Sequence, residues 1–217
     1  MKEWLIVAGK KRTKKEGILA LQGEVREHVA SLTRLKNVRP LKVKYPEQIA
    51  QIDALIIPGG ESTTIGKLIE RNNFVQPIKK FCQQHKPIWG TCAGMILVAK
   101  KVNNRKHYPR QKNYNLNLMD ITVQRNAYGS QLNSFITRHS IPAISDQPLK
   151  LVFIRAPIIT ATGPEVKILT RVKGNIAAAE QDNLFVTNFH PELTEDIRVH
   201  QYFVNKIETT KNSPLSQ

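Results

Sequence analysis

The chain has 217 residues, of which 41% are hydrophobic and 23% charged, and its formal net charge is +16. This composition is typical of one globular domain with appended segments and excludes a disordered chain. No apolar run approaches the ~18 residues that a membrane-spanning helix needs, and two cysteines are too few for a disulfide scaffold.

Two segments concentrate the positive charge. Residues 1–16 hold six Lys/Arg against two Glu, and residues 100–112 hold six against none. Such segments either attract a polyanion such as nucleic acid or form solvated surface, and we favour the second because no aromatic-interleaved or helical recognition pattern accompanies them. The apolar part of the N-terminus is shorter than a secretory signal and is followed by basic residues, so we expect a cytoplasmic protein that does not bind membranes.

The first half of the chain alternates short apolar runs with amphipathic stretches. Strands are predicted at 17–21, 41–44, 54–58 and 87–89, and helices at 24–35, 65–71 and 75–85. Strands that alternate with helices indicate a mostly parallel central sheet with helices on both faces, so the fold class is α/β.

After residue 116 the pattern changes to short strand-like runs. They cover 119–123, 151–154, 166–170, 176–179 and 184–189, and a last helix is predicted near 195–207. We expect these runs to extend the same sheet. The chain then divides into a basic extension (1–16), a single domain (17–208) and a C-terminal tail (209–217).

A glycine pair follows the third predicted strand. Pro58 to Thr64 reads Pro-Gly-Gly-Glu-Ser-Thr-Thr and lies where a strand gives way to a helix, at the edge of the sheet where α/β proteins bind ligands. Glycines let backbone N–H groups turn toward an oxyanion, and Glu61 and Ser62 offer partners for charged groups of a ligand. The same residues also fit an ordinary turn with Ser62 or Thr63 as the helix N-cap, and the two interpretations are compatible.

A cysteine lies in a sharp strand-to-helix turn. Gly90-Thr91-Cys92-Ala93-Gly94 follows the strand at 87–89 and precedes a helix-like run at 95–100. Small residues two before and two after a nucleophile permit the elbow that lifts its side chain out of a sheet. The helix that follows favours a thiolate, so Cys92 is predicted to be a nucleophile. Cys82, within a predicted helix, is interpreted as structural.

A base and an orienting carboxylate stand near the C-terminus. His190-Pro191-Glu192 follows the last predicted strand, with proline stiffening the chain between the two side chains. Alone this pair is weak evidence, but it supplies the two roles that a cysteine nucleophile requires.

These segments resemble the glutaminase subunit of pyridoxal 5′-phosphate synthase, a class-I, triad-type glutamine amidotransferase family. The cysteine elbow and His-Pro-Glu are common to many class-I glutaminases. The segments that match this family more specifically are 19–28, 58–64, 118–126 and 153–157, with Arg198, His200, Tyr202 and Phe203 after the His-Pro-Glu segment.

The resemblance implies a catalytic triad of Cys92, His190 and Glu192, with no metal and no cofactor. It also implies that Gly60, Glu61, Ser62, Arg125, Ile154 and Arg155 bind glutamine and that backbone N–H groups of Gly60 and Ala93 form the oxyanion hole. A guanidinium is independently reasonable at Arg125, because the α-carboxylate of glutamine needs a bidentate cationic partner.

The implied activity is hydrolysis of L-glutamine, with ammonia passed to a barrel-fold synthase subunit that makes pyridoxal 5′-phosphate (vitamin B6). The chain departs from the family pattern at Ser130, Ile136 and Glu180, which bears on partner docking. Two alternatives remain. One is a class-I glutaminase that serves another acceptor, such as that of histidine synthesis, and the other is a non-catalytic, basic nucleic-acid-binding protein on the same fold.

Overall fold

A computed structural model describes residues 12–103, 112–125 and 134–212, with side chains to residue 208. Within this part of the chain, ten strands form one sheet in the order β2-β1-β3-β4-β12-β11-β9-β6-β5, and β10 pairs with β11. Five of these strands form a continuous parallel block: β2 (Val38–Val43), β1 (Lys14–Leu19), β3 (Ala54–Ile57), β4 (Ile88–Thr91) and β12 (Leu184–Thr187).

The C-terminal half widens this block with mixed pairings. The added strands are β11 (Asn175–Gln181), β9 (Ile158–Thr162), β6 (Met119–Gln124), β5 (Ala99–Asn103) and β10 (Lys167–Val172). Only β5 and β6 pair in parallel, and the other pairings among these strands, with β12 included, are antiparallel. The prediction of a sheet with extra strands in the C-terminal half is confirmed.

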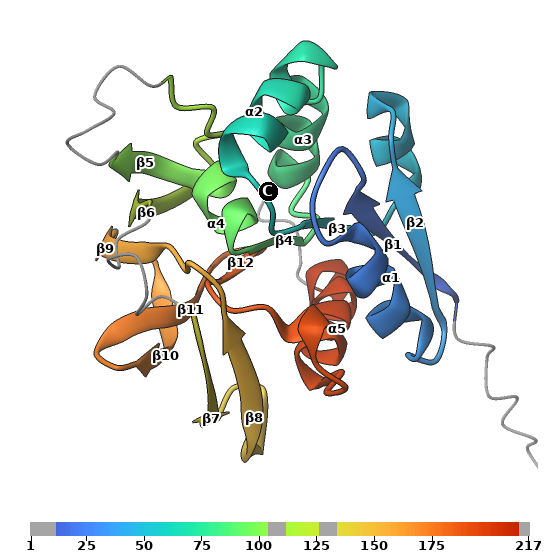
Figure 1. Cartoon of the computed structure of the whole chain (residues 1–217). Coiled ribbons are helices and arrows are strands. Elements are labelled where there is room, and N and C mark those ends of the chain that lie inside the picture. The colour runs from blue at the N-terminus through green and yellow to red at the C-terminus, as the bar shows by residue number, and fades with distance from the viewer. Residues whose placement is uncertain (1–11, 104–111, 126–133, 213–217) are drawn as a thin grey trace, which may run out of the picture.

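Helices cover both faces of the sheet, as predicted (Figure 1). On one face lie α2 (Ser62–Arg71), α3 (Val75–Gln83) and the short α4 (Ala93–Val98), and on the other lie α1 (Val25–Thr33) and α5 (Arg198–Asn212). Successive residues of a strand face opposite sides, so Ile88 packs in the first layer and Trp89 in the second. The inner parallel strands β3, β4 and β12 are therefore buried on both faces, whereas the edge strand β2 is partly exposed.

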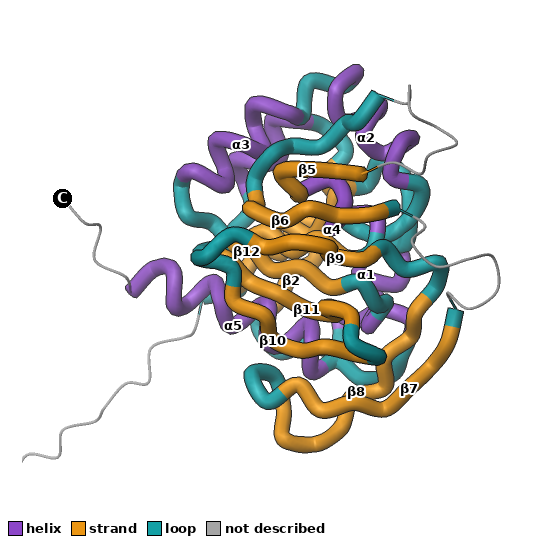
Figure 2. The backbone as a smooth tube through the Cα atoms, turned by 90° about the vertical axis from the view of Figure 1, so that its left-hand side faces the viewer, coloured by secondary structure: helices purple, strands orange, loops and turns teal. Residues whose placement is uncertain are grey.

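A hairpin lies beside this sheet without joining it (Figure 2). Its strands are β7 (Phe135–Ile141) and β8 (Ser145–Phe153), and they pair only with each other in the described part of the chain. Arg198 of α5 fixes the turn, since its Nη1 donates to Ser145 Oγ at 2.7 Å and to the Gln147 carbonyl at 3.2 Å. The prediction that residues 151–154 extend the central sheet is wrong, because β7 supplies their pairing.

Other differences concern where elements begin and end. Residues 99 and 100 belong to β5 and not to the helix predicted at 95–100, because pairing with β6 captures them. The strands β5, β7 and β9 were not predicted. The first strand begins at Lys14, before residue 17, and the last helix runs from Arg198 to Asn212. Two 3-10 turns, Pro46–Gln51 and Pro191–Leu193, complete the described elements.

Two sequence features find their place in this fold. Glu180, where the resembled family usually has arginine, accepts a hydrogen bond from Tyr202 at 2.7 Å and pairs with Lys206, so its carboxylate is held against α5. Ser130 lies outside the described residues, as do residues 1–11 and 104–111 of the basic segments. No helix in the described part of the chain is both long enough and apolar enough to cross a membrane.

Candidate active site

Cys92 occupies the sharp turn between β4 and α4. Its φ of 48° and ψ of −101° are strained for a residue with a Cβ, and its N–H donates to the Thr187 carbonyl at 2.8 Å. The flanking glycines are required by close packing. A Cβ at Gly90 would lie 2.6 Å from the carbonyl carbon of Gly94, and a Cβ at Gly94 would overlap the carbonyl oxygen of Ile57. The predicted sharp turn is therefore present, with Cys92 at the carboxyl end of a central strand.

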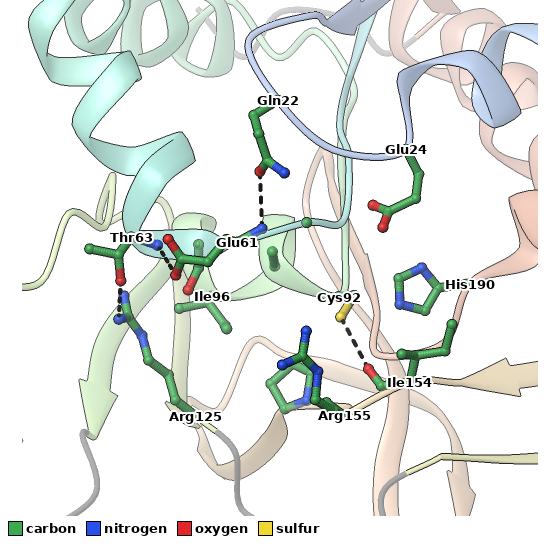
Figure 3. Close-up of a pocket in the computed structure, with 14 residues that line it drawn as sticks. Gln22, Glu24, Glu61, Thr63, Cys92, Ile96, Arg125, Ile154, Arg155 and His190 are labelled. Atoms are coloured by element: carbon green, nitrogen blue, oxygen red, sulfur yellow. Dashed lines mark hydrogen bonds between the residues drawn. The ribbon is translucent and has the colours of Figure 1, made fainter. Parts of the chain in front are cut away.

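His190 and Glu192 follow β12, the strand next to β4 in the sheet. His190 Nδ1 lies 2.7 Å from Glu192 Oε1, and both side chains are buried. This contact makes Nδ1 the protonated nitrogen and leaves Nε2 toward the cavity. Figure 3 shows the sulfur of Cys92 beside the His190 ring. The three residues predicted as a triad are thus brought together from segments about 100 positions apart.

The electrostatics of this pair favour charge on the imidazole. Burial alone would lower the pKa of His190, but its interactions with Cys92 and Glu192 raise the pKa to about 10. Burial would likewise raise the pKa of Glu192, whereas His28 and His190 beside it hold the pKa below its ordinary value. A carboxylate and an imidazolium are the states that support a cysteine thiolate.

The glycine pair approaches the triad from β3. Gly60 has a φ of 136°, a conformation that suits glycine, and a Cβ at Gly59 would lie 2.7 Å from His190 Cε1. The backbone N–H of Glu61 donates to Gln22 Oε1 at 3.0 Å. This turn therefore lines the same cavity as Cys92 and His190.

The N-cap of α2 is Glu61, and not Ser62 or Thr63 as the sequence suggested. Its carboxylate accepts from the N–H groups of Thr63 at 2.8 Å and Thr64 at 2.6 Å, because the longer side chain reaches back over the first turn. Burial would raise the pKa of Glu61, but these hydrogen bonds lower it. Glu61 is held as an anion at the cavity wall.

Two arginines, Arg125 and Arg155, also line the cavity (Figure 3). Arg125 follows β6, is buried, and donates from Nη1 to Thr63 Oγ1 at 3.0 Å. Burial lowers the pKa of its guanidinium, while Glu61 opposes that change. Arg155 has a φ of 42°, and the carbonyl of the preceding Ile154 lies 4.0 Å from Cys92 Sγ.

A cavity of about 590 Å³ joins these parts. Every residue predicted for the site lines it except Glu192, which lies behind His190. The lining residues that the sequence analysis missed are Gln22, Glu24, Thr63, Ile96 and Pro157. Gln22 and Glu24 could have been found, because they follow the first strand and so reach the same edge of the sheet as the other loops.

Glu24 is the additional ionisable group at this edge. Its side chain points toward the His190 ring in Figure 3, and burial raises its pKa although His190 opposes that change. In the described residues, potential ligand atoms of Glu24, His190 and Glu192 lie within 4.8 Å of one another, as a metal site would require. His190 and Glu192 are hydrogen-bonded to each other through Nδ1 and Oε1, which is the arrangement of an oriented base.

Comparison with known proteins gives consistent matches over this region. The model of the SNO glutamine amidotransferase family matches residues 18–209. The chain is 49% identical over 196 residues to the pyridoxal 5′-phosphate synthase subunit PdxT of Ruminiclostridium cellulolyticum, covering 89% of this chain and 100% of that protein. It is 49% identical to PdxT of Clostridium botulinum, covering 90% and 98%. A crystal structure described as a glutamine amidotransferase superposes with a TM-score of 0.81 at 36% identity, covering 89% and 98% of the two chains.

Proposed function

Because the chain belongs to the SNO glutamine amidotransferase family, we propose that Cys92, His190 and Glu192 carry out its glutamine hydrolysis and that the ammonia serves pyridoxal 5′-phosphate synthesis. The observation that supports this assignment most directly is the triad itself. Cys92, in a strained backbone conformation at the end of β4, lies beside the ring of His190, which follows the neighbouring strand β12. Glu192 orients that ring, because its Oε1 lies 2.7 Å from His190 Nδ1.

The first half of the reaction forms a thioester. The Cys92 thiolate attacks the side-chain carboxamide carbon of glutamine, and N–H groups of Gly60 and Ala93 hold the oxyanion. Ala93 is the first residue of α4, so its N–H has no acceptor within the helix. His190 gives its proton to the leaving nitrogen, and ammonia departs as the γ-glutamyl thioester forms.

The second half releases glutamate. Neutral His190 takes a proton from water as the water attacks the thioester carbonyl, and the Cys92 thiolate leaves. Glu192 stabilises the imidazolium that is present at the start of the first half and forms again in the second, because its carboxylate accepts a hydrogen bond from Nδ1–H. The enzyme returns to its initial state, and the chemistry uses no metal or cofactor.

Glutamine is held between the turn at Gly60 and the two arginines. Arg125 pairs with the α-carboxylate, and Gly60, Glu61 and Ser62 bind the remainder of the substrate with the backbone at Ile154 and the side chain of Arg155. The support for this arrangement is that all six residues line one cavity with Cys92.

The partner is a pyridoxal 5′-phosphate synthase subunit, for which we propose a barrel fold. Free ammonia would be protonated and diluted in bulk water, so a direct path between the two subunits is required. We further propose a cytoplasmic protein that binds neither membrane nor nucleic acid, with a basic extension over residues 1–16, a glutaminase domain over 17–208 and a tail over 209–217. The matches to PdxT proteins make another acceptor, or a non-catalytic role, the weaker alternative.

The two cysteines provide a matched test. With the synthase subunit and glutamine present, Cys92→Ala abolishes glutamate production and retains the wild-type fold and partner binding. Cys82→Ala retains activity, because Cys82 lies half-buried in α3 against Asn183. An electrophilic glutamine analogue labels Cys92 alone, as read by mass spectrometry. Activity of Cys92→Ala within tenfold of wild type would remove the nucleophile assignment.

A further inference from the structure

Two buried histidines lie behind the triad and have no part in the mechanism described above. His28 comes from α1 and His200 from α5, and neither side chain is exposed to solvent. His28 Nδ1 lies 3.0 Å from His200 Nε2. At the other end of the ring, His28 Nε2 lies 3.3 Å from Thr91 Oγ1 and 3.7 Å from Glu192 Oε2. The pair therefore reaches from α5 to the triad carboxylate.

Glu192 Oε2 is the oxygen that His190 does not use. Among the described residues it is buried and has no hydrogen-bond partner within normal distance. A buried carboxylate oxygen is costly unless a donor or a positive dipole faces it. His28 Nε2 is the ring nitrogen placed to provide that dipole, provided that it carries the proton.

The protonation of His28 follows from its neighbour. His200 Nδ1 is buried and has no partner in the described part of the chain. An N–H without an acceptor is the rarer and costlier kind of unpaired buried group, so the His200 proton belongs on Nε2. That N–H then donates to His28 Nδ1. His28 must accept there, which leaves its own proton on Nε2, directed between Thr91 Oγ1 and Glu192 Oε2.

The opposite arrangement carries two penalties. A proton on His28 Nδ1 would place the His200 proton on the unpartnered Nδ1, and it would turn a nitrogen lone pair toward Glu192. A charged His28 would create the same unpartnered donor on His200. Burial also lowers the pKa of His28, although Glu192 opposes this, and burial with His28 holds the pKa of His200 well below its ordinary value. Both rings are therefore neutral near neutral pH.

The surroundings fix the two rings in place. Trp89, the residue before Gly90, packs edge-on against both imidazoles, with ring centroids 5.5 Å from His28 and 5.1 Å from His200. The Trp89 indole donates to Thr187 Oγ1 at 3.2 Å, which ties it to the strand that precedes His190. An imidazole held in this way keeps a constant direction for its N–H.

We propose that His28 is a positioning residue for the triad, held by His200 as its Nε2–H tautomer so that its N–H dipole orients and stabilises the Glu192 carboxylate. The inference rests on the proposed function, since Glu192 acts there on His190. In this arrangement His200 on α5 determines the tautomer of His28 on α1. His28 in turn fixes the orientation of the Glu192 carboxylate, which orients His190.

The tautomers can be measured without any activity. Histidine 15N chemical shifts in the full chain distinguish a protonated Nδ1, a protonated Nε2 and a charged ring, and His28→Gln and His200→Gln identify the two signals. We expect both rings to be neutral with the proton on Nε2 at neutral pH. A proton on Nδ1 of either ring, or a charged His28, overturns the proposal. This outcome does not depend on which reaction the enzyme catalyses.

Steady-state kinetics with the synthase subunit present test whether His28 contributes to glutamine hydrolysis. His28→Phe keeps an aromatic ring, somewhat larger than imidazole, and removes the donor. We expect kcat for glutamine hydrolysis to fall about tenfold, the effect of one interaction with a charged group. The KM for glutamine stays within about twofold, because the imidazolium charge whose stabilisation is weakened forms as water attacks the thioester, after glutamine has bound. His28→Gln, whose amide nitrogen replaces Nε2–H, recovers most of the loss.

Controls separate this effect from folding and from the assignment of the reaction. His139→Phe changes a histidine that contacts Thr170 in the β7–β10 region, so it leaves kcat unchanged. Equal kcat values for His28→Phe and wild type, or equal losses in His28→Phe and His28→Gln, refute the positioning role. If thermal unfolding shows that His28→Phe is unfolded, the proposal is tested by the tautomers of His28 and His200 measured in the wild-type chain. A wild-type chain that hydrolyses no glutamine would instead refute the proposed function.

Discussion

The buried carboxyl of Glu16 makes the stability of the fold depend on pH. Glu16 lies in β1 between β2 and β3, and its side chain is 0% exposed. It faces the same side of the sheet as Ile18, under α5, and neither of its oxygens has a hydrogen-bond partner among the described residues. Burial and the negative charge of Asp53 raise the pKa of Glu16 from 4.5 to about 8, although the positive charge of Lys14 opposes this change.

The direction of the effect follows from proton binding. Between pH 4.5 and about 8 the folded chain keeps a proton that the unfolded chain has released, so stability falls as pH rises. Each pH unit in this window costs about 1.4 kcal/mol. The penalty is absent below pH 4.5, reaches roughly 3 kcal/mol at pH 7, and is complete at about 5 kcal/mol above pH 8.

Glu16→Gln removes the charge and keeps the shape of the protonated side chain. We expect the variant to match wild type within about 1 kcal/mol at pH 5 and to exceed its unfolding free energy by roughly 3 kcal/mol at pH 7. Urea unfolding followed by fluorescence measures the difference, because Trp89 is fully buried in the folded state. The exposed Glu165→Gln is the control and should show no such trend. A difference between Glu16→Gln and wild type that stays constant from pH 5 to pH 8 would refute the reasoning.

Three further predictions concern substrate, charge and partner. Arg125→Lys raises the KM for glutamine about tenfold and changes kcat less, because lysine cannot pair bidentately with the α-carboxylate, and steady-state kinetics against Arg138→Lys on the hairpin check this. Any binding of the basic chain to DNA or RNA is nonspecific and disappears as salt rises through the physiological range; a sequence-selective complex that survives 0.2 M salt, about the upper end of that range, would contradict the solvated-surface interpretation. The synthase subunit raises glutamine turnover more than glutamine affinity, since the turn at Gly60 can reorient its peptide at little steric cost, and equal turnover with and without the synthase would exclude this activation.

The substitutions that set this chain apart from the family pattern have different structural consequences. Glu180 is paired with Tyr202 and Lys206 of α5, so its effect on docking is limited by an internal contact. Ile136 lies on β7 of the separate hairpin with 62% of its surface exposed. Of the two, Ile136 is therefore the position at which a partner would meet a changed side chain directly.

The sequence by itself determined the parts of this protein that depend on local pattern. Glycines at positions 90 and 94 identify the elbow because no other residue fits there. The alternating runs of the first half predict the parallel block because its inner strands β3 and β4 are apolar and buried on both faces. The elbow and the His-Pro-Glu segment together predict a nucleophile, a base and an orienting carboxylate at Cys92, His190 and Glu192.

The tertiary structure decided what depends on contacts between distant segments. β5 is held by pairing with β6, and its residues Ala-Lys-Lys-Val-Asn carry too little strand pattern to be recognised. Glu24 reaches the cavity because β1 ends beside β3. The tautomer of His28 depends on His200, 172 positions away. Periodicity reports the neighbours of a residue along the chain, whereas burial, proton position and charge are set by whatever the fold brings against it.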